Sequence, residues 1–264
     1  FYLKILPQII KNKKINEFNE MRKERDQDKD KRKRGKEYLK LSTSSENIFM
    51  KLFPNQKLPD LETCKEIDNH VQKFCDNQNK IKPNTKENPY PIDFGLDLST
   101  RHFLFTLCYL AKPKIVVETG VANGFSSTYI LYALRDIDNS KLISIEKLFF
   151  SWHTKEGVGL SIPKNLKNKH ILKIGAGRDE LAAVDEKIDI FIHDSFHTYD
   201  TMLNEFKIAW PKIRVGGILC SDDASNNDAF LDFADSVNMK PLIISRSNNR
   251  QFGIIQKYLM LWLG

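Results

Sequence analysis

The chain has 264 residues, of which 41% are hydrophobic and 28% charged, a composition typical of soluble globular proteins. The formal net charge of +7 lies within residues 1–40, which hold 14 Lys and Arg against 7 Asp and Glu, so the remainder is electrically balanced. Because positive and negative residues are equal in number outside this segment, we do not expect the folded core to bind nucleic acid. No apolar run reaches the roughly 20 residues that a transmembrane helix needs, and four widely spaced cysteines favour reduced thiols. We therefore expect a cytoplasmic protein without a transmembrane segment.

The chain divides into three expected parts. Residues 1–42 form a charged basic arm, in which residues 11–40 are highly charged and almost free of apolar side chains, which predicts a solvated segment. Residues 43–95 predict a helical N-terminal cap, because apolar side chains recur there at helical spacing before a Pro- and Asn-rich stretch. Residues 96–264 form the main domain, and Asp97 or Ser99 is suited to cap its first helix.

From residue 114 onward, short apolar strands alternate with helices. Strands are expected at 114–120, 141–147, 170–177, 188–194 and 216–223, followed by a hairpin of two strands at 240–246 and 251–257. This alternation predicts an α/β fold with a doubly wound, mostly parallel seven-stranded sheet and a helical N-terminal extension. Ligands bind such sheets beyond the carboxyl ends of the strands, where several polar side chains of this sequence lie.

A glycine-rich turn, "VVETGVANGFSS", follows the first of these strands. Gly120 and Gly124 allow a tight turn close to a ligand, but their spacing does not meet the G-x-G-x-x-G dinucleotide fingerprint. Glu118 precedes the glycines, where a carboxylate would repel a pyrophosphate and attract a cation. Glu146 ends the second strand, where an acid can accept both hydroxyls of a ribose. These features favour S-adenosylmethionine over NAD as the ligand.

The stretches "VVETGVANGFSSTYIL", "LISIEK" and "IDIFIHDSFHTYDTMLNEFKIAWPKIRVGGILCSDD" resemble the successive motifs of class I S-adenosylmethionine-dependent methyltransferases. More narrowly, they are similar to small-molecule and sugar O-methyltransferases, a group in which some members bind a divalent metal. The resemblance covers roughly residues 95–257, and residues 1–90 match no family that we can name.

The resemblance also implies a cofactor site. In this site Glu118, Gly120 and Gly124 form the methionine pocket, Glu146 holds the ribose, and the residues from Gly175 to Gly177 flank the adenine. The full predicted set is Glu118, Gly120, Ala122, Asn123, Gly124, Ser126, Glu146, Gly175, Ala176, Gly177 and Asp194. Of these, Ala122 departs from the usual E-x-G-x-G-x-G pattern.

Three acids lie at the ends of two neighbouring strands. Asp194 ends the fourth strand, and Asp222 and Asp223 follow the fifth. Because neighbouring strands lie about 4.8 Å apart, the carboxylates should converge, and Mg²⁺ or another divalent cation would relieve their repulsion. The resemblance implies that His197, three residues after Asp194, is the general base, so that both are catalytic. In the alternative interpretation the acids contact the cofactor amine or cap a helix, and His197 merely begins the next helix.

Together these features predict methyl transfer to a hydroxyl of a small molecule, such as a sugar or a natural-product intermediate. One alternative is an RNA or protein methyltransferase anchored by the basic arm, although no N/D-P-P-Y/F motif for nucleobase methylation is present. Another alternative is a catalytically silent binding module with the same fold. The long insertion that contains Trp152 and His153 predicts a lid, and the apolar C-terminal end is compatible with a homo-oligomer contact.

Overall fold

The computed structural model describes residues 31–60, 62–78, 94–148, 154–246 and 250–259, together with residues 19, 23, 28 and 80. Among these residues, no helix combines the length and the apolar character that crossing a membrane requires. Most of the basic arm, Trp152 and His153 of the predicted lid, and most of the apolar C-terminal end lie outside the described residues.

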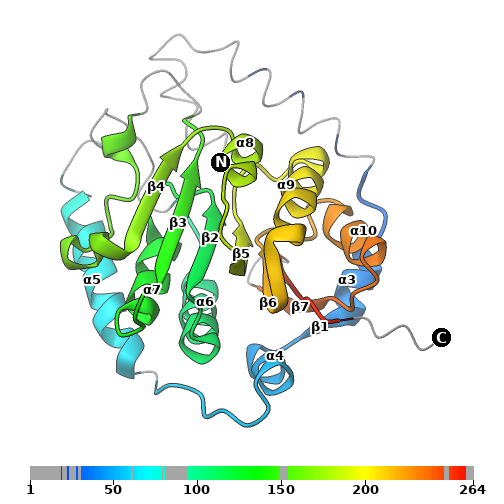
Figure 1. Cartoon of the computed structure of the whole chain (residues 1–264), viewed down its shortest axis with the longest axis horizontal. Coiled ribbons are helices and arrows are strands. Elements are labelled where there is room, and N and C mark those ends of the chain that lie inside the picture. Colours follow the sequence, from blue (N-terminus) through cyan, green and yellow to red (C-terminus); the bar gives the residue numbers. More distant parts are fainter. Residues whose placement is uncertain are drawn as a thin grey trace.

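One sheet of eight strands forms the centre of the molecule (Figure 1). Its strands are β1 (Ser42–Thr43), β2 (Ile115–Thr119), β3 (Lys141–Glu146), β4 (His170–Ile174), β5 (Ile188–His193), β6 (Ile213–Ser221), β7 (Leu242–Ser245) and β8 (Gln251–Gln256). Their spatial order is β1-β7-β8-β6-β5-β2-β3-β4. All neighbouring pairs are parallel except those of β8, which runs antiparallel to both β6 and β7. The predicted doubly wound, mostly parallel α/β sheet is therefore confirmed, and so is the final hairpin.

The sheet has one strand more than the seven that the sequence predicted. The additional strand is β1, a two-residue segment of the N-terminal extension that pairs in parallel with β7. It escaped prediction because two residues are too few to show an alternating pattern of apolar and polar side chains. The N-terminal extension thus contributes to the edge of the sheet.

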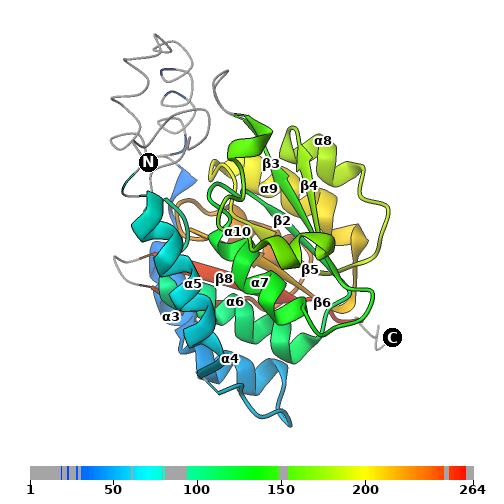
Figure 2. The same cartoon turned by 90° about the vertical axis from the view of Figure 1, so that its left-hand side faces the viewer.

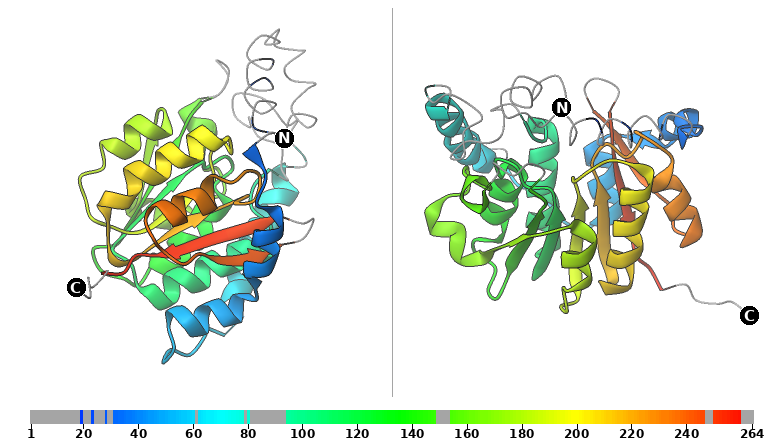
Figure 3. Two further views of the ribbon diagram at one scale, coloured as in Figure 1. Left: turned by 90° about the vertical axis from the view of Figure 1, so that its right-hand side faces the viewer. Right: turned by 90° about the horizontal axis from the view of Figure 1, so that it is seen from above.

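Helices cover both faces of the sheet (Figures 2 and 3). The α-helices are α3 (Gly35–Leu41), α4 (Ser45–Leu52), α5 (Glu62–Gln78), α6 (Leu98–Ala111), α7 (Phe125–Leu134), α8 (Gly177–Ala182), α9 (Tyr199–Lys212) and α10 (Ala229–Ser236). Two short 3₁₀ helices, η2 (Lys155–Gly157) and η3 (Lys164–Lys169), lie between β3 and β4. Buried side chains of α4 to α7 share one core cluster, whereas those of α3 and α8 to α10 share another.

The two core clusters follow from the alternation of side chains along each strand. In β2, Val116 belongs to the cluster that contains α6 and α7, whereas the next residue, Val117, belongs to the cluster that contains α9 and α10. Strands that are buried on both faces read as continuous apolar runs, as they do in this sequence. The polar residues at their carboxyl ends are the exception, and these ends position the candidate site.

Helix boundaries follow local signals in the sequence. Asp97 caps α6 by accepting a hydrogen bond from the backbone N–H of Thr100 at 2.9 Å, which selects it over Ser99 as the predicted cap. At the other end of α6, Lys112 adopts a left-handed conformation, with φ of 45°, directly before Pro113. Thr198 caps α9, so this helix begins at Tyr199, two residues after His197.

Candidate active site

The glycine-rich turn joins β2 to α7 and lies against the end of β5. Gly120 has φ of 86°, and a Cβ atom at this position would overlap the carbonyl oxygen of Asp194. Gly124 has φ of 80°, and its Cβ would lie 2.8 Å from the Cα of Gly159. Ala122 occupies the middle of the turn with φ of 46°, a conformation that usually favours glycine. The turn therefore needs glycine at positions 120 and 124, whereas Ala122 adopts a left-handed conformation although it has a side chain.

The carboxylate of Glu118 is buried behind this turn. It is 1% exposed, and it accepts hydrogen bonds from Ser126 Oγ at 2.9 Å, from Ser144 Oγ at 2.7 Å and from the hydroxyl of Ser127. Burial raises the pKa of Glu118 to about 7, even though the three serine hydroxyls favour the charged form. Its predicted place in the methionine pocket stays a prediction, since its contacts hold α7 against β2 and β3.

His170 extends this buried polar cluster from the start of β4. Its Nε2 lies 2.8 Å from Ser144 Oγ. Because the Ser144 hydroxyl already donates to Glu118, the His170 ring must donate to Ser144, which fixes its tautomer. Burial lowers the pKa of His170 to about 4, so the ring is neutral at physiological pH. The sequence analysis missed this residue, which is the first of its strand and carries no motif.

Glu146, the last residue of β3, stabilises the glycine-rich turn directly. One carboxylate oxygen, Oε2, accepts the backbone N–H of Val121 at 2.6 Å and that of Ala122 at 2.9 Å. The residue is 4% exposed. Glu146, the predicted partner of the ribose, therefore lies at the expected edge of the sheet. It also fixes the conformation of the turn.

The remaining predicted cofactor residues lie along the same edge. Gly175 follows β4, Ala176 precedes α8 and Gly177 begins it, where a Cβ atom would overlap Oε1 of Glu205. Asn123 is buried within the turn, and its carbonyl accepts the N–H of Ser161 at 2.9 Å. The turn, Glu146 and these small residues end the neighbouring strands β2, β3 and β4, as the sequence predicted.

An acidic cluster lies beside the turn, at the ends of β5 and β6. Asp194, His197 and Asp222 each offer one ligand atom, and these three atoms lie within 4.8 Å of one another. His197 Nε2 is 3.6 Å from Asp194 Oδ1 and 3.9 Å from Asp222 Oδ2. Asp223 is not part of this group, and its Oδ1 lies 3.6 Å from Nε of Arg250. The structure thus groups His197, rather than the third predicted acid, with Asp194 and Asp222.

The charges of this cluster determine the protonation of His197. Burial opposes the imidazolium, but Asp194, Asp223 and Asp222 outweigh burial and raise the pKa of His197 to about 9. Burial also raises the pKa of Asp222 well above its ordinary value, and the neighbouring Asp194 and Asp223 add to this effect. Without another cation, the imidazole is therefore positively charged at neutral pH and serves as a counter-ion of the acids.

Arg246 is a neighbour of the cluster that the sequence analysis missed. It follows β7 and is almost fully buried, with 4% of its side chain exposed. Its guanidinium donates from Nε to Asp97 Oδ2 at 2.6 Å and from Nη1 to Asp222 Oδ1. Asp222 therefore presents its other oxygen, Oδ2, to His197. The feature of the sequence that could have identified Arg246 is its position at the carboxyl end of a predicted strand.

A buried hydrogen-bonded pair, His193 and Glu205, supports the turn that carries His197. His193 Nδ1 lies 2.7 Å from Glu205 Oε2, which also accepts the hydroxyl of Thr119 at 2.6 Å. Ser195 Oγ donates to the other oxygen of Glu205 at 3.0 Å. The sequence analysis missed Glu205, although its position on the apolar face of α9 is a signal, since a buried acid needs partners.

The cluster has the donors that a divalent cation requires. It gathers two carboxylate oxygens and one imidazole nitrogen, and carboxylates suit Mg²⁺ and Mn²⁺ whereas imidazole suits transition metals. Among the described residues, Nδ1 of His197 and Oδ1 of Asp223 are buried without a hydrogen-bond partner. Asp223 Oδ1 faces Arg250, and Nδ1 is not the ring nitrogen of His197 that faces the acids, so the case for a cation rests on the three ligand atoms that converge.

Comparisons with known proteins agree with this architecture. A family model described as a methyltransferase domain matches residues 117–224, which run from within β2 to just after Asp222 and Asp223. No curated protein matches the chain in sequence.

Similar solved structures include three methyltransferases. The O-methyltransferase of Bacillus cereus in complex with SAH is 14% identical, with a TM-score of 0.54 over 83% of this chain and 100% of that one. TomG, an O-methyltransferase of Streptomyces achromogenes involved in tomaymycin synthesis and solved with SAM, is 14% identical, with a TM-score of 0.55 over 84% of this chain and 99% of that one. The SAH-bound methyltransferase PaMTH1 of Podospora anserina is 11% identical, with a TM-score of 0.54 over 81% and 94%. The family match and these shared folds confirm the predicted resemblance of this chain to the class I S-adenosylmethionine-dependent methyltransferases.

Proposed function

We propose that the chain transfers a methyl group from S-adenosylmethionine to a hydroxyl of a small molecule in the cytoplasm. The observation that carries this proposal is the contact between Gly120 and Asp194, which places the candidate cofactor turn and the acidic cluster at one edge of the sheet. Methyl transfer needs this proximity, because the methyl carbon and the acceptor oxygen must meet in one place. The cofactors bound in the similar structures support the same assignment.

The cofactor residues in this proposal are those that the sequence predicted. Glu146 holds the ribose, and the backbone of Gly120 to Gly124 approaches the methionine portion. The residues from Gly175 to Gly177 flank the adenine. The left-handed glycines of the turn support the proposal, because they let the backbone turn tightly at the strand end where ligands of such sheets bind.

The chemistry at the acceptor is a displacement. The acceptor oxygen forms a bond to the methyl carbon while the bond between this carbon and sulfur breaks, leaving S-adenosylhomocysteine. The hydroxyl proton must pass to a base, and His197 can accept it only when its imidazole is neutral. Since the pKa of His197 is raised to about 9, the imidazole carries a proton at neutral pH and must lose it before it can act as the base.

A divalent cation, Mg²⁺ or Mn²⁺, would be held by Asp194 and Asp222, with Asp223 or His197 as a further ligand. When bound, it would lower the pKa of a coordinated acceptor hydroxyl. His197 faces the acids through Nε2, and this atom cannot bind a cation and accept a proton at the same time. Base and ligand are therefore alternative roles for His197, and they predict different experimental results.

We favour small molecules over RNA or protein as acceptors. Arg34, the last residue of the basic run at 31–34, forms ion pairs with Asp232 and Asp235 of α10. Its guanidinium charge is therefore compensated within the chain, which weakens the argument that this run anchors a polyanion.

The test is a methyl-transfer assay with S-adenosylmethionine that carries a labelled methyl group, and with a panel of sugars, polyols and phenols as acceptors. We expect label in at least one acceptor, loss of transfer with excess chelator, and recovery with Mg²⁺ or Mn²⁺. If His197 is the base, His197→Ala should lower turnover by about 10²–10⁴-fold and leave Mn²⁺ binding intact. If it is a ligand, the same change should weaken Mn²⁺ binding.

A matched control is His102→Ala, because His102 pairs with Asp68 on α5, away from the acidic cluster. Transfer should remain near normal in this variant. Full transfer in excess chelator would remove the metal from the proposal. Label in RNA or in protein, with none in any small molecule, would overturn the acceptor class.

A further inference from the structure

Residues 31–43, here called the N-terminal brace, are packed into the body of the molecule. Their last two residues form β1, where Ser42 pairs with Ile243 and Thr43 with Ile244 of β7. Tyr38 of α3 is 1% exposed and belongs to the core cluster shared by α9 and α10. The brace therefore has a fixed position at the edge of the sheet, beside α10 (Figure 1).

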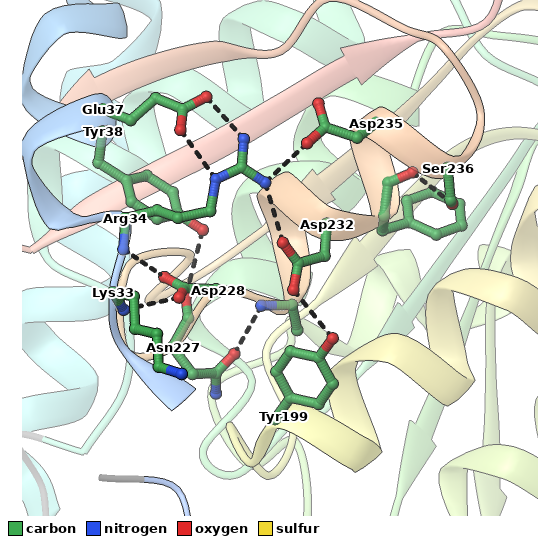
Figure 4. Close-up of polar contacts among 12 residues, drawn as sticks. Lys33, Arg34, Glu37, Tyr38, Tyr199, Asn227, Asp228, Asp232, Asp235 and Ser236 are labelled. Carbon is green, nitrogen blue, oxygen red and sulfur yellow. Dashed lines mark hydrogen bonds and ion pairs between the residues drawn. The ribbon is translucent and has the colours of Figure 1, made fainter. Parts of the chain in front are cut away.

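Arg34 fixes the brace against α10 (Figure 4). Its Nη1 donates to Asp232 at 2.9 Å and to Asp235 at 2.8 Å, while Glu37 of the brace binds the same guanidinium. The hydroxyl of Tyr199, at the start of α9, donates to Asp232 at 2.9 Å. Because Asp235 is exposed and Asp232 is only partly buried, these ion pairs orient the brace more than they stabilise the fold.

Asp228 connects the brace to the loop that carries the candidate acids. Its carboxylate accepts the backbone N–H of Lys33 at 2.6 Å and that of Arg34 at 3.0 Å. Its own N–H donates to the carbonyl of Lys31 at 2.9 Å. The loop between β6 and α10 begins with Asp222 and Asp223 and ends at Asp228, so the brace holds the end opposite the acids.

Asn227 continues the connection to His197. It is completely buried, and its Nδ2 donates to the carbonyl of His197 at 3.2 Å. Its Oδ1 accepts the N–H of Ala229 at 3.0 Å, which fixes the orientation of the amide. The Tyr38 hydroxyl donates to the carbonyl of Asn227 at 3.2 Å. One continuous chain of hydrogen bonds thus runs from the brace to the backbone of His197.

We propose that the N-terminal brace positions the candidate catalytic turn, and that Asn227 is the positioning residue through which it acts. The hydrogen bonds of Asn227 set the backbone of His197, while those of Asp228 set the loop that carries Asp222 and Asp223. The effect of this positioning on methyl transfer rests on the proposed function, but the hydrogen-bonded connection between the brace and His197 does not. The brace is therefore a part of the active-site support that lies about 150 residues or more away in sequence from the acids.

The experiment measures amide hydrogen exchange and His197 imidazole NMR signals in the full chain. In Asn227→Asp, an isosteric change, a carboxylate oxygen replaces the donor to the His197 carbonyl. We expect exchange at residues 195–198 to become at least about tenfold faster and the His197 signal to shift. Tyr38→Phe removes only the hydroxyl and should produce a smaller change in the same direction. His197→Gln identifies the signal.

Ser236→Ala is the matched control, because it removes a hydroxyl bond to the carbonyl of Phe233 on α10 without touching the brace. It should leave exchange at residues 195–198 unchanged. Unchanged exchange and signals in both Asn227→Asp and Tyr38→Phe would overturn the proposal. Calorimetric titration of the wild-type chain with S-adenosylhomocysteine tests the proposed function separately. Absence of binding would refute the proposed function, and the exchange result would still decide the role of the brace.

Discussion

Glu118 and Asp222 are both buried carboxylates near the carboxyl edge of the sheet, 1% and 4% exposed, yet their surroundings differ. Glu118 is surrounded by the hydroxyls of three serines, all of which donate to it. Asp222 has one strong partner, Arg246, and otherwise faces the acids Asp194 and Asp223 and the imidazole of His197. The carboxylate of Glu118 thus has hydrogen-bond donors around it, whereas that of Asp222 lies close to two other acids.

This difference separates a structural acid from a binding site. A closed set of hydrogen bonds holds its elements together and offers little to a ligand. Converging acids cost stability unless a cation or a substrate completes them. We therefore propose that the chemistry takes place at Asp194, His197 and Asp222, whereas the serine contacts of Glu118 support the elements around the glycine-rich turn and its place in the methionine pocket stays a prediction. The predictions below test this division.

The largest effect is expected where the two regions meet, at Gly120. Gly120→Ala would place a Cβ atom in a left-handed conformation and against the carbonyl oxygen of Asp194. We expect a loss of about 2–5 kcal/mol in the free energy of unfolding, from backbone strain and overpacking together. Urea denaturation measures this loss. The control is Gly35→Ala, which meets no atom within 4 Å and should leave stability within about 0.5 kcal/mol of wild type. Equal effects of the two changes would refute the close contact.

Addition of Mn²⁺ should stabilise the fold through the acidic cluster alone. At a free concentration of 100 times the dissociation constant, a ligand that binds only the folded state adds about 2.7 kcal/mol. Thermal melts with and without Mn²⁺ measure this gain. Asp194→Asn should abolish it, whereas Glu118→Gln should retain it, because Glu118 lies outside the cluster. A gain that survives in Asp194→Asn would place the cation elsewhere.

Glu146→Ala should weaken binding of S-adenosylhomocysteine by about 1–3 kcal/mol, the scale for losing a charged hydrogen-bond partner. The loss has two sources, since Glu146 both faces the proposed ribose site and accepts the N–H groups of Val121 and Ala122. Calorimetric titration measures it. Glu146→Gln retains one acceptor oxygen for the turn and should lose less. Unaltered affinity in Glu146→Ala would remove this residue from the cofactor site.

The smallest predicted effect concerns the satisfied region and depends on pH. The pKa of His170 falls from 6.5 in the unfolded chain to about 4 in the fold, so its contribution to stability is complete above pH 6.5 and is lost as the pH falls toward 4. When the pH falls from 7 to 5, the free energy of unfolding of the wild type should decrease by up to about 2 kcal/mol more than that of His170→Gln. Urea denaturation of both proteins at the two pH values measures the difference. Parallel losses would show that His170 is not held neutral.

The sequence predicted the regular parts of the fold well. The apolar runs from residue 114 onward located seven strands, because strands buried on both faces need continuous apolar side chains. The cofactor edge was predictable for the same reason, since Glu146 and the glycines interrupt these runs at strand ends. Local patterns of this kind depend only on neighbouring residues.

The contacts that join distant segments could not be predicted. Arg246 reaches Asp222 and Asp97 from other elements, and Glu205 reaches His193 from the far side of a turn. No periodicity in the sequence specifies such pairs. The grouping of His197 with Asp194 and Asp222, rather than Asp223 with them, likewise depends on the backbone after β6, where Asp223 adopts a left-handed conformation with φ of 45°.

The N-terminal segment shows the same limit most clearly. Its composition predicts a solvated segment, and a solvated segment at residues 1–40 could be removed without unfolding the main domain, because few apolar residues follow residue 10. The structure buries Tyr38 in the core and engages Arg34 with α10, so we now expect deletion of 1–40 to lower the melting temperature. A single buried aromatic residue is too small a signal to outweigh the 24 charged and polar residues among residues 11–40.

The most direct test of the central claim is calorimetric titration of the full chain with S-adenosylhomocysteine and, separately, with NAD. A glycine turn without the dinucleotide spacing, stabilised by an acid at the end of β3, predicts a saturable heat with S-adenosylhomocysteine and none with NAD. Tight binding of NAD, with no heat from S-adenosylhomocysteine, would contradict the proposed cofactor and the chemistry that depends on it.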